Sequence, residues 1–402
     1  MRILVISQYF YPENFRINDV CLGLKERGHE VVVLTGKPNY PNGKYFNGYG
    51  WFKKNNEIWN GIKIYRSNLI LRGSGNGLRL LFNYFSFAFF ASIKVFSINK
   101  TFDKIFIFAP SPITVGIPGI FARRKYKAKT FLWIHDLWPE SIRIAGGIEN
   151  KLILRIVDKL TRWIYSKTDK LLIQSKGFIS YLENQQVNLN KIKYYPFYAE
   201  TFYKIEDPES SYSKKLPEGF KVLFAGNIGE GQSFETLLKA AETIKSQNFP
   251  ITWIVFGEGR LKEYVKEQIT KNNLKEFFIL MGSVPAEDMP KYFACVDALL
   301  VSLKKSDIFS ITIPGKLQSY LACGRPIIGS LDGVGAEIIQ DAKAGFTSSA
   351  ESVNDLAIQI IKLFHTPIEI RNQMGLNARK YFELEFEREI LLDKLELILN
   401  GN

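Results

Sequence analysis

The chain alternates short apolar, β-rich runs with helical patterns along almost its whole length. Strand-like runs occur in the first half at residues 3–7, 30–34, 63–66, 104–108, 130–134, 170–174 and 192–195. Helical patterns fit between several of them, at 16–27, 78–98, 151–168 and 176–184. Continuous apolar strands joined by helices are typical of parallel sheets whose two faces are both covered. The alternation therefore predicts an α/β protein with mostly parallel, doubly wound sheets.

Residues 199–219 interrupt this alternation. They read AETFYKIEDPESSYSKKLPEG, rich in Glu, Ser, Lys and Pro and without a period, which predicts a linker. The alternation restarts with strand-like runs at 221–225, 251–256, 277–280, 297–301 and 325–328, and helical patterns close the chain. A length of 402 residues also suits two domains. We predict Rossmann-like domains at 1–198 and 220–383 with a cleft between them, and a helix at about 384–402 that crosses back onto the first domain.

Composition restricts the partners and the compartment. The formal net charge is +13, which predicts an anionic partner: a phosphorylated substrate, an anionic lipid surface or nucleic acid. The chain has no zinc-finger spacing and no RNA-recognition signature, so nucleic acid is not expected. Three widely spaced cysteines and the absence of a signal-peptide pattern at MRILVIS predict a cytoplasmic protein.

Residues 77–98 are long and apolar enough to need separate treatment. They read GLRLLFNYFSFAFFASIKVFSI, a length that could cross a bilayer, but Arg79 and Lys94 lie inside them, so a spanning helix is not expected. Two interpretations stay open: a buried core helix, or a helix in the membrane interface with aromatic side chains among the acyl chains. The candidate membrane contacts are Arg72, Arg79, Phe85, Phe89, Phe90 and Lys94.

Three glycine-containing stretches lie where a strand is followed by a helix. They are Gly226-Asn227-Ile228-Gly229, Gly257-Glu258-Gly259 and Pro314-Gly315-Lys316. Glycine lets backbone N–H groups approach a ligand, and a helix N-terminus attracts phosphate. Lys316 adds a full positive charge, so its stretch predicts a diphosphate site. For each stretch a structural turn remains the alternative.

Two polar stretches follow predicted strands of the first half, where ligands of such sheets bind. Glu13, Asn14 and Arg16 come after the first strand, and His135 and Asp136 after the run at 130–134. Helix capping by the first group, and a core histidine paired with Asp136, remain alternatives. The chain lacks Asp-x-Asp, the P-loop, Gly-x-Ser-x-Gly and His-Glu-x-x-His. A sugar-nucleotide enzyme without Asp-x-Asp is expected to stabilise its leaving diphosphate with cations and helix N-termini, without a metal.

Six ordered blocks resemble the family 4 retaining glycosyltransferases of the GT-B fold, and within them the WbuB-like group of N-acetyl-L-fucosamine transferases of O-antigen or capsule assembly. The blocks are RILVISQYFYPENFRINDVCLGLKERGHEVVVLTGKPNYPNG, HDLWPES, FAGNIGEGQSFETLL, FGEGRLKEYV, PGKLQSYLACGRPI and GVGAEII. The resemblance covers nearly the whole chain. It implies catalytic roles for His135, Lys316 and Arg16, and acceptor contacts by Glu13, Asn14, Arg16 and Asp136. The donor contacts that it implies, with those from the glycine stretches, are Gly226, Asn227, Gly229, Gly257, Glu258, Gly259, Pro314, Gly315, Lys316, Gln318, Ser319 and Glu337.

The chain departs from the family at known contact positions. Many members carry two glutamates with seven residues between them, which fall here at Ile311 and Ser319, and an arginine and a lysine that fall at Asn227 and Gln232. In their absence, the resemblance implies that Gln318, Ser319 or Glu337 contacts the ribose. Lys316 or Arg16 would supply the positive charge of the missing arginine and lysine.

The resemblance implies transfer of a sugar, such as N-acetyl-L-fucosamine, from a UDP-sugar to a polyprenyl-diphosphate-linked saccharide. The expected location is the cytoplasmic face of the bacterial membrane, docked on anionic lipid, with neither cofactor nor metal. Two alternatives stay open. One is an isomerase like the UDP-sugar 2-epimerases, which share the fold, and the other is a non-catalytic membrane-associated protein.

Overall fold

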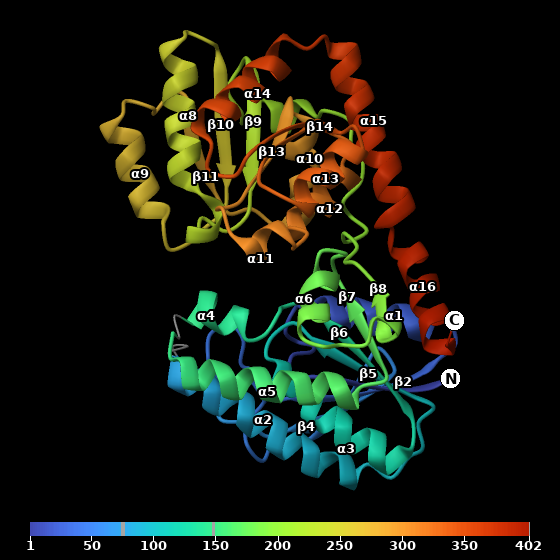
Figure 1. Ribbon diagram of the computed structural model, residues 1–402. Helices are drawn as coiled ribbons and strands as arrows, with labels where there is room; N and C mark the ends of the chain where they lie inside the picture. Colours follow the sequence, from blue (N-terminus) through green and yellow to red (C-terminus); the bar gives the residue numbers. More distant parts are fainter. Residues whose placement is uncertain (74–76, 147–148, 402) are drawn as a thin grey trace. The chain divides into compact units, whose positions relative to one another are not determined.

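The computed structural model describes residues 1–73, 77–146 and 149–401 and divides into two compact units (Figure 1). Unit 1 comprises Met1–Gln174, Phe178–Tyr195 and Leu392–Asn402, and unit 2 comprises Ser175–Gly177 and Pro196–Leu391. Each unit holds one sheet covered by helices on both faces. The predicted fold class, two doubly wound α/β domains, is confirmed. The predicted end of the first domain, residue 198, lies three residues after the division at Tyr195.

Unit 1 has an eight-stranded sheet in the order β3-β4-β2-β1-β5-β6-β7-β8. Every pair of neighbours is parallel except β3 and β4, which are antiparallel. In chain order its elements are β1 Arg2–Ser7, α1 Arg16–Glu26, β2 Glu30–Gly36, β3 Asn56–Trp59, β4 Ile62–Ser67, α2 Gly77–Ser97, β5 Lys104–Ala109, α3 Gly116–Tyr126, β6 Lys129–Ile134, α4 Glu140–Gly146, α5 Lys151–Lys167, β7 Lys170–Ile173, α6 Phe178–Asn184 and β8 Ile192–Tyr194.

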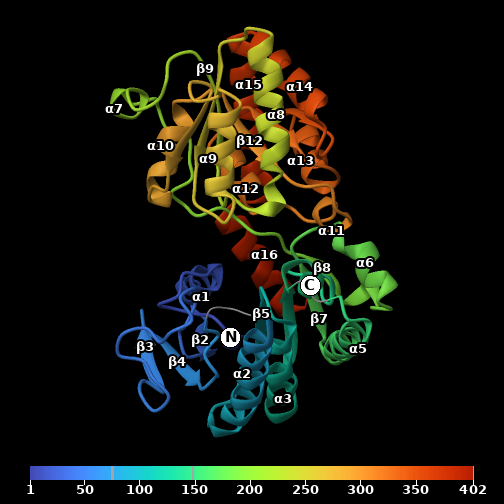
Figure 2. The same ribbon diagram turned by 90° about the vertical axis from the view of Figure 1, so that its left-hand side faces the viewer.

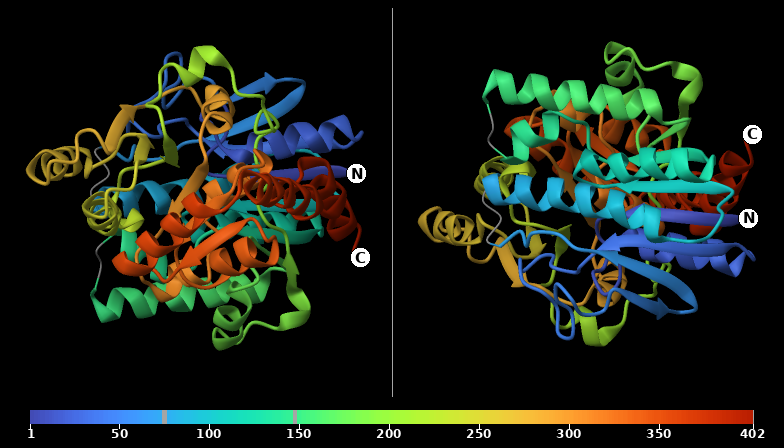
Figure 3. Two further views of the ribbon diagram at one scale, coloured as in Figure 1. Left: turned by 90° about the horizontal axis from the view of Figure 1, so that it is seen from above. Right: turned by 90° about the horizontal axis from the view of Figure 1, so that it is seen from below.

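The central strands of unit 1 are apolar on both faces, as the sequence predicts. In β1 the four residues Ile3 to Ile6 have no exposed surface. Helices α2, α3 and α5 run side by side over one face of this sheet (Figures 1 and 3), with α3 in contact with both of the others. The last residues of the chain belong to unit 1 as well, where Arg27 donates to Asp393 at 3.1 Å.

Unit 2 has a six-stranded parallel sheet in the order β11-β10-β9-β12-β13-β14. The chain proceeds outward from β9 to β11 and then returns to the other side of β9, so the direction of winding reverses between β9 and β12. Its elements are α7 Ser210–Ser213, β9 Phe220–Ala225, α8 Phe234–Ser246, β10 Ile251–Phe256, α9 Lys262–Lys271, β11 Phe278–Gly282, α10 Met289–Ala294, β12 Ala298–Ser302, α11 Asp307–Ser310, α12 Gly315–Ala322, β13 Ile327–Ser330, α13 Val334–Asp341, β14 Gly345–Ser348, α14 Val353–His365 and α15 Ile368–Glu385, followed by α16 Arg388–Asn400, which continues into unit 1.

Two hydrophobic cores cover the two faces of this sheet. Successive strand side chains point to opposite faces. In β10, Ile254 and Phe256 therefore join one core with α10, α12, α13 and α15. Trp253 and Val255 join the other with α8, α9 and α14 (Figure 2). With both faces covered, polar groups that bind a ligand can collect only at the ends of the strands.

Candidate functional site

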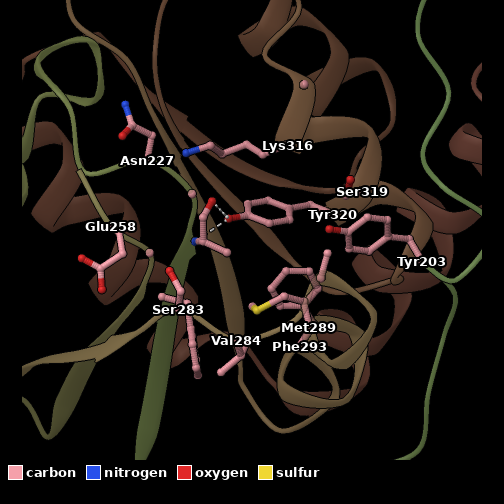
Figure 4. A pocket seen from close by; sticks show the side chains of 16 residues that line it. Tyr203, Asn227, Glu258, Ser283, Val284, Met289, Phe293, Lys316, Ser319 and Tyr320 are labelled. Carbon is pink, nitrogen blue, oxygen red and sulfur yellow. Dashed lines mark hydrogen bonds between the residues drawn. The ribbon is translucent and has the colours of Figure 1, made fainter. Parts of the chain in front are cut away.

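A cavity of about 500 Å³ opens in unit 2 where β9, β10 and β11 end and α12 begins (Figure 4). This is the carboxyl edge of the sheet, next to the reversal between β9 and β12, the place where open α/β sheets bind their ligands. Its lining comprises Tyr203, Ala225, Gly226, Asn227, Phe256, Gly257, Glu258, Ser283, Val284, Ala286, Met289, Phe293, Gly315, Lys316, Ser319 and Tyr320.

Two glycine turns form one wall of the cavity by packing backbone against backbone. Gly226 donates its N–H to the Phe256 carbonyl at 2.9 Å, and Gly257 donates to the Gly282 carbonyl at 2.8 Å. Gly257 has φ +147°, and a Cβ there would lie 1.8 Å from the Gly226 carbonyl oxygen. No other residue could occupy this position without moving the wall.

Lys316 supplies the positive charge of the site. It stands in the first turn of α12, and its Nζ donates to Gln232 Oε1 at 2.6 Å and lies 3.6 Å from the centroid of the Phe224 ring. Burial lowers the pKa of Lys316 well below its usual value, and no carboxylate of the described residues opposes this shift. An ammonium that is buried without a counter-ion, beside a helix N-terminus, is poised to receive an anion.

Aromatic and apolar side chains form the other side of the cavity. In Figure 4 the Lys316 ammonium points toward Asn227, while Tyr203 and Phe293 lie on the side away from it. Tyr203 stacks on Phe293 with 6.3 Å between ring centroids. Tyr320 accepts the Ala225 N–H at 2.8 Å through its hydroxyl, which fixes the end of β9 at the cavity. The cavity therefore has one charged end and one apolar end.

Seven of the predicted donor residues line the cavity together: Gly226, Asn227, Gly257, Glu258, Gly315, Lys316 and Ser319. The others lie outside its lining. Pro314 is the residue before α12, Gly229 and Gly259 lie farther along the two glycine turns, and Gln318 is buried within α12. Glu337 is exposed in the first turn of α13. Of the three candidates for the ribose contact, Ser319 is the one in the lining.

Sequence reasoning missed the apolar end of this cavity. Tyr203 lies in the segment predicted to be a linker, yet its ring forms part of the wall. Ser283 and Val284 directly follow β11, so their position after a strand was a usable signal. Met289 and Phe293 belong to α10 and give no local indication of a site.

In unit 1, His135 directly follows β6 and is buried, with 8% of its surface exposed. Its ring makes edge contacts with Phe108 and Trp133, at centroid distances of 4.5 and 4.4 Å. Burial, and then the charge of Arg16, lower the pKa of His135 well below its usual value. The imidazole is therefore neutral near pH 7, and Arg16, the first residue of α1, supplies the positive charge at this edge.

Asp136 lies beside a group of tyrosines at the same edge of the sheet. Burial raises the pKa of Asp136 to about 7. Tyr84 of α2 lies near Tyr9 and Ser111, and its pKa is raised by burial and, among smaller contributions, by the charge of Asp136. We call Tyr9, Arg16, Tyr84, His135 and Asp136 the carboxyl-edge cluster of unit 1. It joins residues that follow β1 and β6 with one from α2.

Glu13 serves the loop after β2. It is 2% exposed, and its carboxylate accepts the backbone N–H groups of Phe10, Asn39 and Tyr40 at 3.3, 2.8 and 2.7 Å. Burial raises the pKa of Glu13 to about 7, against these hydrogen bonds. Asn14, next to it, is exposed. The buried carboxylate of Glu13 thus holds the backbone of the edge in place.

The predicted membrane contacts spread along α2 and the segment before it. Phe85 and Phe89 are 47% and 61% exposed, Phe90 is half-buried against Trp51, and Lys94 is half-buried. Arg79 is exposed, whereas the Arg72 guanidinium lies 4.8 Å over the ring of Tyr40. Helix α2 buries Phe87, Ala91 and Val95, as the buried-helix interpretation expects, and exposes its opposite face, for which the membrane-interface interpretation stays a prediction.

Comparisons with known proteins agree with this arrangement. Residues 207–381 match the family described as Glycosyl transferases group 1. A protein of Escherichia coli K12 described as a colanic acid biosynthesis glycosyl transferase, WcaI, is 24% identical over 81% of this chain and 82% of its own. A Campylobacter jejuni N-acetylgalactosaminyltransferase, whose name specifies a diphospho-undecaprenol-linked saccharide, is 25% identical over 46% of this chain and 47% of its own.

A solved structure covers both units. The Anabaena protein HepE, crystallised with UDP, aligns with a TM-score of 0.71 at 14% identity over 100% of each chain. At this identity the likeness establishes the fold alone. The chain thus has the two-domain fold of the GT-B glycosyltransferases. Its residues 207–381, which include all of the cavity lining except Tyr203, match the glycosyl transferases group 1 family.

Proposed function

We propose that this protein is a retaining glycosyltransferase that moves a sugar from a UDP-sugar to a polyprenyl-diphosphate-linked saccharide. The observation that carries the proposal is Lys316, a buried ammonium at the start of α12 in a glycine-walled cavity of about 500 Å³. That volume lies within the range of small-ligand pockets. A diphosphate provides the anion that this ammonium lacks.

The lining of the cavity offers separate places for the diphosphate, the ribose and the base of a nucleoside diphosphate. We place the diphosphate at Lys316, Gly315 and Gly226, where charge and backbone N–H groups converge. The base takes the side formed by Gly257, Glu258, Ser283 and Val284. Ser319 stands one turn after Lys316 on the same face of α12, so its hydroxyl takes the ribose.

Lys316 then has a catalytic role as well as a binding role. Negative charge grows on the diphosphate as the bond to the sugar breaks, and a fixed ammonium in a low-dielectric site stabilises that charge. In a retaining transfer the acceptor hydroxyl attacks from the face that the diphosphate leaves, and a phosphate oxygen takes its proton. In unit 1, neutral His135 would hydrogen-bond the transferred sugar, while Arg16, Asp136 and Asn14 would position the acceptor.

The isomerase alternative receives less support from the cavity. Epimerisation of a sugar nucleotide needs carboxylates that exchange a proton with the ring. Among the described residues that line the cavity, Glu258 alone carries a carboxyl group, and it is 55% exposed and paired with Lys262 at 2.7 Å. Incubation with a UDP-N-acetylhexosamine and no acceptor is expected to give no epimer.

The relatives set the range of substrates to test. The Campylobacter transferase is named for a diphospho-undecaprenol acceptor, and the Anabaena structure contains UDP. We propose an acceptor of the same chemistry at the cytoplasmic face of the membrane and an N-acetylated deoxyhexosamine donor such as UDP-N-acetyl-L-fucosamine. A thermal-shift screen of UDP- and GDP-sugars, followed by UDP release with a lipid-linked saccharide in EDTA, tests donor, acceptor and metal independence.

The decisive variant is Lys316→Met, which keeps the length of the side chain and removes its charge. One charge-assisted contact to the diphosphate is lost, so the affinity for UDP measured by calorimetry should fall about 10- to 100-fold. Turnover should fall further, because the same contact strengthens in the transition state. Lys304→Met, an exposed lysine of unit 2 outside the cavity, is the matched control. Equal affinities in the two variants would contradict the proposal.

A further inference from the structure

Helix α2 exposes an unusually apolar face. Leu78, Phe82, Phe85, Phe89, Ile93 and Phe96 point outward with between 47% and 73% of their surface exposed. The helix is long and apolar enough to cross a membrane, but a third of its most apolar stretch is buried inside unit 1. Its inward side packs on β2, β4 and α3. A contiguous apolar surface of this kind marks a site for an apolar partner.

Part of this face is a groove rather than a flat surface. Helices α2 and α3 enclose a volume of about 440 Å³, which we call the α2–α3 groove. It is lined by Phe85, Ala88, Phe89, Ser92, Ile93, Phe96, Ile117 and Phe121. The Ser92 hydroxyl donates to the Ala88 carbonyl at 2.7 Å, so its hydrogen-bonding need is met within α2. The groove therefore suits a hydrocarbon, because a polar ligand would lose its hydrogen bonds to water and find no hydrogen-bond partners in the lining.

One end of the groove adjoins the carboxyl-edge cluster. Phe85 follows Tyr84, which lies near Tyr9 and whose pKa responds to the charges of Arg72 and Asp136. From Phe85 the groove follows α2 to Phe96, eleven residues or about 16 Å along the helix. A chain in the groove would thus have its head among the residues proposed to hold the acceptor.

The helices around the groove are strongly basic, which favours a ligand that carries phosphate. Because Lys125 lies at the Phe96 end, where it donates to the Val95 and Phe96 carbonyls, the place of the phosphate depends on Arg72 at the other end. Helices α2, α3 and α5, which share this face of the unit 1 sheet, contain ten basic residues and one acid, Asp158. Their net charge of +9 is most of the +13 of the whole chain. Hydrocarbon flanked by positive charge is the complement of a phosphate-bearing lipid.

We propose that the α2–α3 groove binds the isoprenoid chain of the acceptor lipid, with the lipid diphosphate at Arg72 and the saccharide directed to Asp136. The proposal rests on the proposed function for the identity of the lipid. It differs from simple docking on a bilayer, which would involve all the outward side chains of α2 alike. If the groove is the binding site, substitution of a side chain that lines it should weaken lipid binding more than substitution of an equally exposed side chain of α2 outside it.

Two phenylalanines of α2 provide this comparison. Phe89 lines the groove and is 61% exposed, whereas Phe82 lies outside it and is 60% exposed. Farnesyl diphosphate, a soluble isoprenoid diphosphate, serves as the probe, and inorganic pyrophosphate reports the head alone. Phe89→Asn should weaken farnesyl diphosphate binding about tenfold or more, because a buried phenyl contact is lost, and Phe82→Asn less than about twofold. Calorimetry on the full chain measures both.

Three results would contradict the proposal that the α2–α3 groove binds the isoprenoid chain. They are equal losses in the two variants, no loss in either, or farnesyl diphosphate binding no tighter than pyrophosphate. Phosphatidylglycerol vesicles form a separate arm, in which equal losses in both variants would assign the face to the bilayer surface. UDP titration of the same samples separates this proposal from the proposed function, because the UDP cavity lies in unit 2. If the protein bound farnesyl diphosphate but not UDP, the proposed glycosyltransferase function would be rejected and the isoprenoid-binding role of the groove would stand.

Discussion

Both units bury a basic side chain near the carboxyl edge of their sheet, but they treat its charge differently. In unit 1 the guanidinium of Arg66 is 2% exposed and donates to the Glu57 carboxylate and to the carbonyls of Tyr11 and Gly36. In unit 2 the ammonium of Lys316 has an amide oxygen and the face of a phenyl ring as its contacts.

The difference separates a structural charge from a functional one. A buried cation is costly unless a carboxylate and well-placed acceptors compensate it. Arg66 receives that compensation from the protein itself and ties Tyr11, after β1, and Gly36, the last residue of β2, to β3. Lys316 does not, so unit 2 keeps an unfavourable charge that a phosphate ligand would relieve.

The largest effect is expected from removing the compensated charge. Arg66→Met removes the arginine partner from Glu57, which keeps the Tyr49 hydroxyl, and from the Tyr11 and Gly36 carbonyls, so the free energy of unfolding should fall by about 3 kcal/mol. Arg123→Met is the control, because its pair with Asp169 is 43% exposed on the arginine side and should be worth less than about 1 kcal/mol. Urea unfolding measures both. A loss as small as that of the control would mean that Arg66 is not a structural charge.

The sequence predicted most of this fold because the period of its apolar residues is local information. It missed elements whose stability comes from the neighbours. β3 and β14 have four residues each, and the GFTS of β14 has little β character of its own. Helix α3 contains Gly116, Pro118 and Gly119, poor helix formers, and is held by its packing against α2, β5 and β6.

The candidate site shows the same difference between residues that a local sequence pattern identifies and residues that only packing brings into place. The glycine turns and Lys316 were found because each is a short pattern with its own chemistry. Tyr203, Met289 and Phe293 were not, because they reach the cavity only when distant segments pack together. The opposite case is Glu13, whose acidic side chain after β1 indicated an acceptor contact, while the structure uses it to hold the Asn39 and Tyr40 backbone.

The pH dependence of stability should sharpen the comparison. Burial lowers the pKa of Lys316 in the folded protein, so between that value and the usual lysine pKa the unfolded chain holds one more proton. The free energy of unfolding contributed by Lys316 should therefore rise with pH in this window, by at most about 1.4 kcal/mol per pH unit. The affinity for UDP should fall over the same window, because the ammonium loses its proton.

The measurement is the difference between the wild type and Lys316→Met from pH 7 to about pH 9.5, a window below the usual lysine pKa. Other groups, such as Lys37 with its pKa lowered to about 8, titrate in both proteins and cancel. A difference that stays constant with pH would show that Lys316 is charged to the same extent in both states, and the unpaired-cation argument would fail.

The smallest effect on stability tests the comparison most directly, because it gives Lys316 the partner that Arg66 already has. Gln232→Glu is nearly isosteric and places a carboxylate at the atom that Nζ now contacts at 2.6 Å. Stability should rise by no more than about 1 kcal/mol, since part of the attraction offsets the desolvation of the new carboxylate. UDP affinity should fall about tenfold, because the carboxylate now occupies the ammonium and repels the diphosphate. Gln247→Glu adds the same charge at an exposed position and should change neither quantity. If Gln232→Glu left UDP binding intact, the diphosphate would have to lie elsewhere in the cavity.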